Sequence, residues 1–339
     1  MLIGLCGGIC AGKHTIADYL IREQGFQWLE LTKSNPAPVS GDSENDTYLQ
    51  ESAIGDCAKG HRFESTDTFV DFVTKRWTER WVTTDIWDRS LLDKLLIRPF
   101  FLLVSVDAPV NLRWQRFRQR CSSRQLEPAP LEKFMLWSDR QLYDRDIGQA
   151  YLVDRASVRL FNASSSLKEL YAALETVELP NEERLRPSWD QYFMQLASLA
   201  AQRSNCMKRR VGCVIVRDRR VISTGYNGTP RNITNCNEGG CPRCNSGEGG
   251  GAGLSTCLCL HAEENALLEA VKIAQVGITE VVYSKSYNMD KESAAILGAA
   301  GVNLRQLSQV KPMKPIARHI ENLANYLTAA DWFNIPLTF

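Results

Sequence analysis

The chain has 339 residues, and its 40 Lys and Arg residues balance its 39 Asp and Glu residues to a net charge of +1. This length predicts two domains at roughly 100–200 residues per domain. Hydrophobic residues at 44% exclude global disorder, and the near-zero charge excludes a generally basic protein that wraps nucleic acid. No apolar run approaches the ~20 residues that span a bilayer, and the start lacks the basic flank of a signal peptide. We therefore expect a cytoplasmic or nuclear protein with neither nucleic-acid nor membrane partners.

The first half of the chain alternates strand and helix patterns, which is typical of a parallel α/β domain. Residues 34–66 are rich in Ser, Asp, Glu, Gly and Pro and predict a surface insertion. We expect this domain to span residues 1–178 and a polar linker to span 179–187. The predicted strands are 2–6, 26–31, 99–106 and 158–161, and the predicted helices are 16–21, 69–81, 107–120 and 167–174.

A glycine-rich loop follows the first predicted strand and matches most of a Walker A motif. In that motif backbone N–H groups and a helix N-terminus surround phosphate oxygens, and the lysine reaches the terminal phosphates. His14 stands where the motif has a Ser or Thr whose hydroxyl binds magnesium. Asp85 is a candidate for the second magnesium carboxylate. The residues predicted to contact phosphate, and with it a magnesium-bound nucleotide, are Gly7, Gly12, Lys13 and Thr15.

This half of the chain resembles the P-loop small-molecule kinases, dephospho-CoA kinase above all. The resemblance rests on residues 7–13, on Val106-Asp107-Ala108-Pro109 before an Arg-rich helix, and on Leu160-Phe161-Asn162 before the last helix. It implies a kinase-like fold. Phosphoryl transfer, nucleotide sensing and assembly remain open as uses of that fold.

A second pattern of elements occupies residues 188–310. It predicts a helix followed by a hairpin with a tight turn at Asp218-Arg219, and then a loop over residues 227–256. The tail, residues 311–339, has a helical pattern around 316–327 and no assigned role. The predicted helices are 189–201, 262–274 and 293–300, and the predicted strands are 211–216, 221–226, 280–283 and 302–307.

His261-Ala262-Glu263 begins a predicted helix after a cysteine-rich loop, which is the first half of the zinc-deaminase signature H-x-E…P-C-x-x-C. In that chemistry the histidine binds zinc, and the glutamate moves protons from zinc-bound water to the ring and the leaving ammonia. By itself the triplet is weak evidence, because a histidine at a helix start beside a carboxylate is usually structural. The surrounding sequence strengthens it. Residues 225–230 (GYNGTP), 257–266 (CLCLHAEENA), 281–290 and 301–306 occur in the order typical of deoxycytidylate (dCMP) deaminases.

Residues 186–308 thus resemble the dCMP deaminase family, whose long form also has an N-terminal kinase-like domain. The resemblance implies a cytidine-deaminase-like α/β/α sandwich behind the kinase-like parallel sheet. It implies zinc-dependent hydrolysis of the cyclic amidine of dCMP to give dUMP and ammonia, as a supply of dTTP precursors. It further implies a homo-oligomer, a hexamer, that dCTP activates and dTTP inhibits.

The same resemblance assigns roles to individual residues. Glu263 becomes the proton shuttle and His261 a ligand of the catalytic zinc. Asn227 becomes a hydrogen-bond partner of the deoxyribose, although Asn-Gly also favours turns whatever the function. Tyr287 is placed near the substrate, or is a half-buried aromatic residue at a strand end. The candidates for the substrate phosphate, or for an ordinary solvated charged surface, are Lys208, Arg209 and Arg210.

The second half of the zinc signature is missing, because no cysteine follows Cys259. The family has a strand, the Pro-Cys-x-x-Cys turn and the start of a helix at a point where Ala270 joins Val271 directly. A clean internal loss, such as a skipped exon, is our hypothesis for this pattern. A catalytic zinc needs three protein ligands, so His261 alone does not hold it, and the lost strand predicts a gap in the sheet. The alternation of Cys257, Cys259 and His261 leaves open a substitute site on one face of a strand.

Three functions therefore stay open: a dCMP deaminase, a non-catalytic nucleotide-binding or assembly subunit (or a defective splice product), and a P-loop kinase.

Five of the eleven cysteines lie between residues 236 and 259. In a reducing compartment such clustering favours a metal over disulfides. The spacing of Cys236, Cys241, Cys244 and Cys257 suits a structural zinc, with Cys259 as an alternative ligand and free thiols as the other interpretation. The remaining cysteines are expected to be small buried apolar side chains: Cys6, Cys10, Cys57, Cys121, Cys206 and Cys213.

Overall fold

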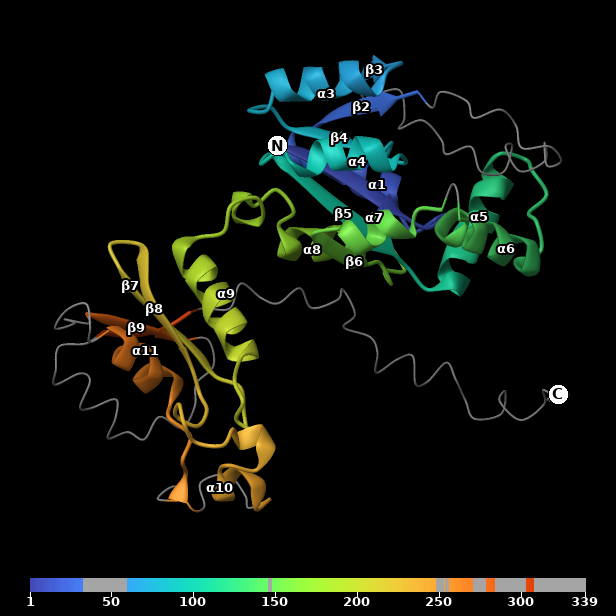
Figure 1. The fold of residues 1–339 in the computed structure, drawn as a ribbon. Helices are drawn as coiled ribbons and strands as arrows, with labels where there is room; N and C mark the ends of the chain where they lie inside the picture. Colours follow the sequence, from blue (N-terminus) through green and yellow to red (C-terminus); the bar gives the residue numbers. More distant parts are fainter. Residues whose placement is uncertain are drawn as a thin grey trace, which may run out of the picture. The chain divides into compact units, whose positions relative to one another are not determined.

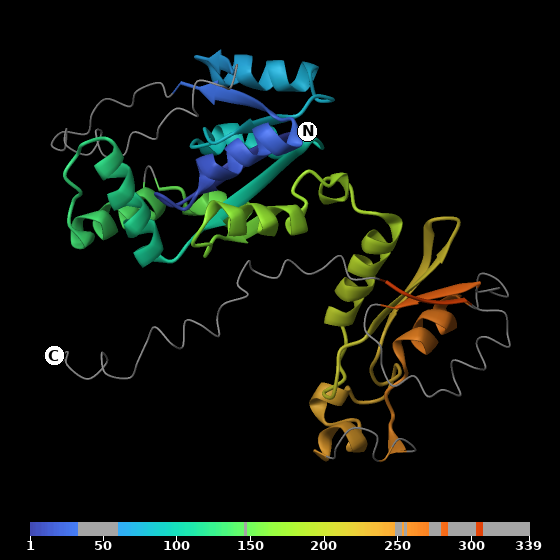
Figure 2. The same ribbon diagram turned by 180° about the vertical axis from the view of Figure 1, so that it is seen from behind.

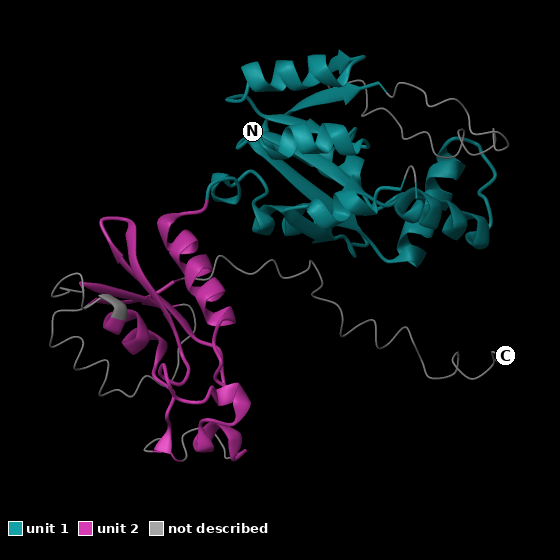
Figure 3. Ribbon diagram, viewed as in Figure 1, with its two compact units in different colours: residues 1–186, 312–339 teal, residues 187–311 magenta. Residues whose placement is uncertain are grey.

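A computed structural model describes residues 1–32, 60–145, 148–247, 253, 256–270, 279–283 and 303–307 (Figure 1). The chain divides into two compact units whose described residues lie within 1–186 and 187–311 (Figure 3). Most of the predicted linker belongs to the first unit, since Leu179 and Leu185 pack on that unit's core and Glu182–Arg184 form a 3₁₀ turn. Several predicted features lie outside the described residues: most of the 34–66 insertion, Cys57, Tyr287, the helices at 271–274 and 293–300, and the tail.

The first unit contains a six-stranded sheet in which every described pair is parallel. This confirms the predicted α/β class. Two of its strands were not predicted: His61–Phe63, at the end of the expected insertion, and Trp81–Thr83, which begins at the residue where a helix was expected to end. In sheet order the strands are β3 (His61–Phe63), β2 (Gln27–Leu31), β4 (Trp81–Thr83), β1 (Leu2–Gly7), β5 (Phe101–Asp107) and β6 (Val158–Phe161).

Helices cover both faces of this sheet, which Figures 1 and 2 show in turn. One face packs α1 (Lys13–Gln24) and α8 (Leu167–Val177) around Leu5 and Val104. The other packs α3 (Thr66–Lys75), α4 (Arg89–Leu96) and α7 (Ala150–Arg155). Alternate residues of β1 point to opposite faces, so this short central strand supplies both cores. A third cluster joins α5 (Val110–Ser123) and α6 (Leu131–Tyr143) beside the glycine-rich loop.

The second unit begins with α9 (Trp189–Gln202), which a capping box at Ser188 and Gln191 starts. The hairpin of β7 (Gly212–Arg217) and β8 (Arg220–Tyr226) follows as predicted. Its turn residues Asp218 and Arg219 both have positive φ, 50° and 62°. Two-residue turns of this kind match the twist of antiparallel strands.

Within the described residues, the strands of the second unit form two separate pairs. Strands β9 (Glu280–Tyr283) and β10 (Asn303–Gln306) pair in parallel with each other, and β7 pairs with β8, but among the described residues no strand joins the two pairs. Arg305 on β10 bonds Asp190 on α9 at 2.6 Å and Glu280 on β9 at 2.9 Å. An ion-pair contact thus links β10 to α9 in this unit.

Among the described helices, none is long and apolar enough to cross a membrane.

Candidate functional site

Helix α11 (Ala262–Ala270), which carries the His-x-Glu triplet at its start, lies directly on the β7–β8 hairpin. Gly225 on β8 makes this approach possible. A Cβ atom there would lie 2.2 Å from the Ala262 carbonyl oxygen and 2.4 Å from the Ala266 nitrogen. Ser223 donates to the Ala266 carbonyl at 2.8 Å, and Asn265 donates to the Tyr226 carbonyl at 2.8 Å. The start of α11 is therefore fixed against the end of β8.

The two residues with predicted chemical roles, His261 and Glu263, are both exposed. The side chain of Glu264, not Glu263, caps the helix by accepting from the His261 N–H at 2.9 Å. The negative charge of Glu263 has a detectable effect on Cys213 of β7. Burial, with Glu263 as the next cause, raises the pKa of the Cys213 thiol to about 11. The carboxylate of Glu263 is thus near the hairpin and still open to solvent.

The loop after β8 is held by Asn227. Its Oδ1 accepts from the Ser204 hydroxyl at 2.7 Å and from the Val211 N–H at 2.8 Å, and its Nδ2 donates to the Arg209 carbonyl at 2.8 Å. Leu260 and Gly228 form an antiparallel bridge that joins this loop to the residue before His261. Asn227 therefore orients the GYNG loop beside the start of α11.

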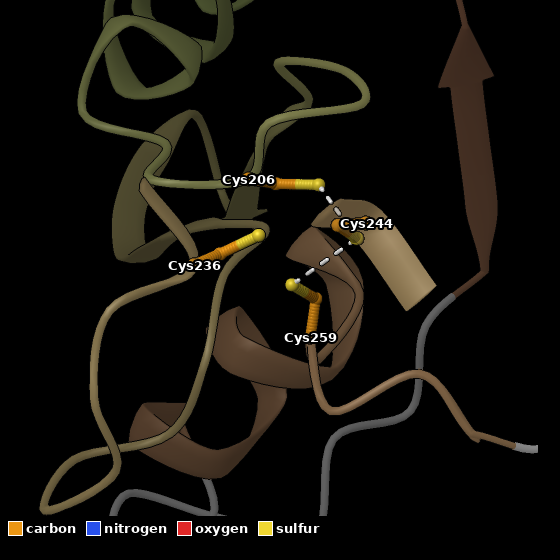
Figure 4. A group of neighbouring side chains, drawn as sticks. All are labelled: Cys206, Cys236, Cys244 and Cys259. Atoms are coloured by element: carbon orange, nitrogen blue, oxygen red, sulfur yellow. Dashed lines mark hydrogen bonds between the residues drawn. The ribbon is translucent and has the colours of Figure 1, made fainter. Parts of the chain in front are cut away.

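Six cysteines lie together on four separate segments of the second unit: Cys206, Cys236, Cys241, Cys244, Cys257 and Cys259. In Figure 4 the sulfurs of Cys206, Cys236, Cys244 and Cys259 point toward one another. The described cysteines form no disulfide with one another. Cys236 belongs to a 3₁₀ turn (Cys236–Glu238), and Cys244 to the short α10 (Pro242–Asn245). Two four-cysteine groups have all sulfurs within 4.8 Å of one another: Cys206, Cys236, Cys244 and Cys259, and Cys241, Cys244, Cys257 and Cys259.

Backbone N–H groups favour the thiolate form at part of this cluster. Burial alone would raise the pKa of Cys241, but hydrogen bonds from the N–H groups of Cys244 and Leu258 and from the thiols of Cys244 and Cys259 together lower that pKa to about 6. Burial likewise opposes ionisation of Cys206, yet hydrogen bonds from the N–H groups of Arg209 and Lys208 and from the same two thiols together lower its pKa. At Cys244 and Cys259 burial dominates, and nearby sulfurs raise the pKa further. A cluster with thiolate character is suited to a soft, positively charged metal ion.

In the glycine-rich loop of the first unit, the buried side chain of Lys13 is hydrogen-bonded to the loop's own backbone. The Lys13 Nζ donates to the carbonyl oxygens of Gly7 at 3.0 Å and Gly8 at 3.1 Å. A cavity of about 510 Å³ is lined by Gly12, Lys13, His14, Thr15 and Arg116 among others.

Two neighbours of that loop differ from a magnesium site. Asp85, the candidate magnesium carboxylate, accepts from the Leu31 N–H at 3.0 Å and so joins the end of β2 to the segment after β4. The Nε2 of His14 lies 3.4 Å from the Thr84 hydroxyl. The magnesium ligands expected of a kinase are thus replaced or otherwise engaged here.

Comparison with known proteins decides the family. The sequence model described as the cytidine and deoxycytidylate deaminase zinc-binding region matches residues 187–287. A protein of Schizosaccharomyces pombe named deoxycytidylate deaminase is 46% identical over 327 residues, covering 90% of this chain and 96% of that protein. The chain belongs to the deoxycytidylate deaminase family.

One further relative and one solved structure also match the chain. The Saccharomyces cerevisiae protein of the same name is 44% identical over 283 residues, covering 73% of this chain and 88% of its own. The crystal structure of dCMP deaminase from cyanophage S-TIM5 in complex with dCMP and dUMP covers 36% of this chain and 98% of that one, at 24% identity and a TM-score of 0.29. That TM-score is too low to support an argument about this structure.

The residues present do not fit the catalytic zinc of a deaminase. His261 is exposed, and neither four-cysteine group of the described residues includes it. The substitute site of Cys257, Cys259 and His261 is not formed, because both cysteines belong to the six-cysteine cluster. Of the triplet, only His261 is a zinc ligand, because Glu263 has the proton-transfer role. A catalytic site with three protein ligands is therefore two ligands short.

The cysteine cluster differs from the predicted zinc site in its membership. Cys236, Cys241, Cys244 and Cys257 are divided between the two four-cysteine groups, and Cys259 belongs to both. Cys206, which was expected to be a buried apolar side chain, is a member of the cluster. Sequence reasoning missed it because 29 residues separate it from Cys236, so only the fold brings it near. The backbone N–H groups of Lys208 and Arg209 hydrogen-bond to its sulfur.

Proposed function

We propose that this protein is a deoxycytidylate deaminase, a hydrolase for dCMP that yields dUMP and ammonia, and that the 339-residue chain holds one half of the catalytic site. The observation that carries the proposal is the His261-x-Glu263 pair at the start of α11, seated on β8 through Gly225. The relationship to proteins named deoxycytidylate deaminase supports the choice of substrate. Glu263 is the group suited to proton transfer, because its carboxylate is exposed beside that helix start.

The other half of the site is absent at a definable position. The alignment with the S. pombe protein is longer than the number of residues of this chain that take part in it. That protein therefore has residues with no counterpart here. A segment lost after Ala270 would remove both the cysteine pair and the strand between the two described strand pairs. One loss thus accounts for the incomplete metal set and for the divided sheet.

The test restores the segment. Residues of the S. pombe protein that have no counterpart here are inserted between Ala270 and Val271, and conversion of dCMP to dUMP is followed with added zinc. We expect turnover by the restored chain, and none by the restored chain with Glu263→Gln, which keeps the size of the side chain and removes its acid. A folded restored chain that binds zinc and does not convert dCMP would overturn the proposal.

Substrate contacts form the next part of the proposal. Asn227 is assigned to the deoxyribose, and Lys208 and Arg209 to the phosphate, with Tyr287 near the base. The bond from Asn227 Nδ2 to the Arg209 carbonyl supports this assignment, because it couples the loop to the basic segment. In the restored chain, Lys208→Ala should raise KM for dCMP more than KM for deoxycytidine, which has no phosphate. Equal changes for both substrates would contradict a phosphate contact.

Assembly and regulation also belong to the proposal: a hexamer with dCTP as activator and dTTP as inhibitor. Helix α9 supports an assembly surface, because none of its residues is buried and Trp189 and Tyr192 are 45% and 42% exposed. Light scattering of the full chain tests the oligomer, and a monomer at micromolar concentration would contradict it. A reducing compartment, the cytosol or nucleus, suits described cysteines that form no disulfide.

We also propose that the cysteine cluster holds zinc in a structural role, separate from catalysis. Closed tetrahedral thiolate sites of this kind hold irregular loops together. The loop between β8 and α11 has two short helical turns and little apolar core of its own.

The glycine-rich loop favours a second, accessory function, the binding of nucleotide phosphates without their transfer. The Lys13 contacts and the adjacent cavity support binding, and the use of Asp85 by Leu31 argues against a magnesium site. Calorimetry with ATP should show binding that Lys13→Ala removes and that the surface change Lys75→Ala keeps. Magnesium-dependent release of ADP would instead support the kinase function.

A further inference from the structure

The cysteine cluster contains two more sulfurs than one zinc ion can bind. Each four-cysteine group has the composition of a closed tetrahedral site, and the two groups have Cys244 and Cys259 in common. If one ion occupied the first group, Cys241 and Cys257 would remain within 4.8 Å of the shared pair. If one ion occupied the second group, Cys206 and Cys236 would remain. One ion therefore leaves two thiols at metal-binding distance in either case.

We propose that the cluster holds two zinc ions bridged by the thiolates of Cys244 and Cys259. Cys206 and Cys236 complete the first ion, and Cys241 and Cys257 complete the second. The proposal rests on the structural zinc proposed above and extends it from one ion to a binuclear site with six ligands.

Sulfur–sulfur distances support the arrangement. A zinc–sulfur bond of about 2.3 Å in a tetrahedron places neighbouring sulfurs about 3.8 Å apart. Cys206 and Cys244 lie 3.8 Å apart, and Cys244 and Cys259 lie 3.9 Å apart (Figure 4). The second distance is the edge that both tetrahedra would share. The protein alone thus presents the shared edge at close to the spacing that the metal requires.

Hydrogen bonds also distinguish the four terminal sulfurs from the two bridging sulfurs. Three terminal sulfurs accept N–H donors: Cys236 from Met207 at 3.4 Å, Cys241 from Leu258 at 3.4 Å, and Cys257 from Arg243 Nη1 at 3.6 Å. The fourth, Cys206, faces the N–H groups of Lys208 and Arg209.

The two shared sulfurs have different neighbours. Within the described part of the chain, the side-chain contacts found for Cys244 and Cys259 are with other sulfurs. A bridging thiolate uses its lone pairs on two ions and needs no donor, whereas a terminal thiolate keeps charge that N–H donors stabilise.

The test counts metal in the full 339-residue chain, purified with reductant and saturated with zinc. Because this chain lacks the catalytic cysteine pair, the tightly bound ions belong to the cluster. We expect two zinc ions per chain by elemental analysis and a zinc–zinc distance in X-ray absorption. Cys206→Ser and Cys257→Ser each remove a terminal ligand and should weaken one ion. Cys244→Ser should release both, and Cys213→Ser, on β7 outside the cluster, should keep both.

Each alternative has its own result. One zinc per chain that Cys257→Ser leaves in place would overturn the bridge and keep the structural zinc. No zinc would overturn both proposals, and iron with sulfide would overturn zinc as the metal. If the serine variants fail to fold, cobalt titration of the unchanged chain decides, because sulfur-to-cobalt absorption should saturate at two equivalents. Saturation at one would overturn the inference.

Discussion

Removal of zinc is expected to unfold the second unit and to leave the first unit folded. Among its described residues, the buried apolar side chains other than cysteines are Ile215, Ala262 and Ala266. Burial of one Ile contributes about 1.5–3 kcal/mol, and each methyl adds about 0.8 kcal/mol, which together give about 3–5 kcal/mol. Structural zinc contributes about 10–16 kcal/mol in small domains. Since domains are stable by about 5–15 kcal/mol in total, the metal is the larger contribution here.

The first unit has no such dependence, because three clusters of apolar side chains support its sheet and helices. The assay is limited proteolysis of the full chain with and without a strong zinc chelator, read by mass spectrometry. Cleavage should spread through the described parts of residues 187–311 on chelation, while a fragment ending near Arg186 survives. Re-addition of zinc should restore protection. A second unit that resists protease equally well without metal would refute this reasoning.

Three further outcomes follow from single contacts. Gly225→Ala should destabilise the second unit by about 1–3 kcal/mol in denaturant unfolding, because the added methyl meets the backbone of α11, whereas Thr224→Val on the exposed side of β8 should change stability little. Glu264→Ala should cost about 0.5–2 kcal/mol by removing the cap on the His261 N–H, and an unchanged midpoint would contradict that role. Burial, with Asp88 adding to it, raises the pKa of Tyr151 to about 12. The stability that its neutral phenol contributes is present below the ordinary tyrosine pKa near 10 and is lost as the pH rises through 12. An ultraviolet titration should show this late phase, and Tyr151→Phe should remove it.

Much of the fold could be predicted where local signals were strong. The Asp218-Arg219 turn between two β-branched runs predicted the hairpin, and the apolar run before Asp107 predicted β5. Strand β4 was missed because it has three residues and because Trp77 and Trp81 continue the helical spacing of α3 past the end of that helix. Strand β3 was missed for a similar reason, since it is short and lies at the sheet edge.

The His-x-Glu pair of the candidate site was easier to predict from the sequence than the cysteine cluster. The His261-x-Glu263 pair was recognisable from motif order alone, and the structure places it at the start of α11. The membership of the cysteine cluster was only partly predicted, because spacing along the chain groups Cys236 with Cys241. The turn of α10 and the loop after α9 instead place Cys244 beside Cys206. Distances in space, which sequence spacing does not encode, decide which sulfurs share a metal.

The splice hypothesis has a direct test in the gene. Genomic sequence between the codons of Ala270 and Val271 should contain an in-frame stretch that encodes Pro-Cys-x-x-Cys. Uninterrupted coding sequence across those two codons would contradict a skipped exon.

The conversion of dCMP to dUMP by the unmodified 339-residue chain with zinc supplied tests most directly whether this chain is catalytically complete. We predict a folded protein that produces no dUMP above the rate of its Glu263→Gln variant, because His261 is without the cysteine pair. Clear turnover that Glu263→Gln abolishes would contradict it, and would mean that other residues complete the catalytic metal site.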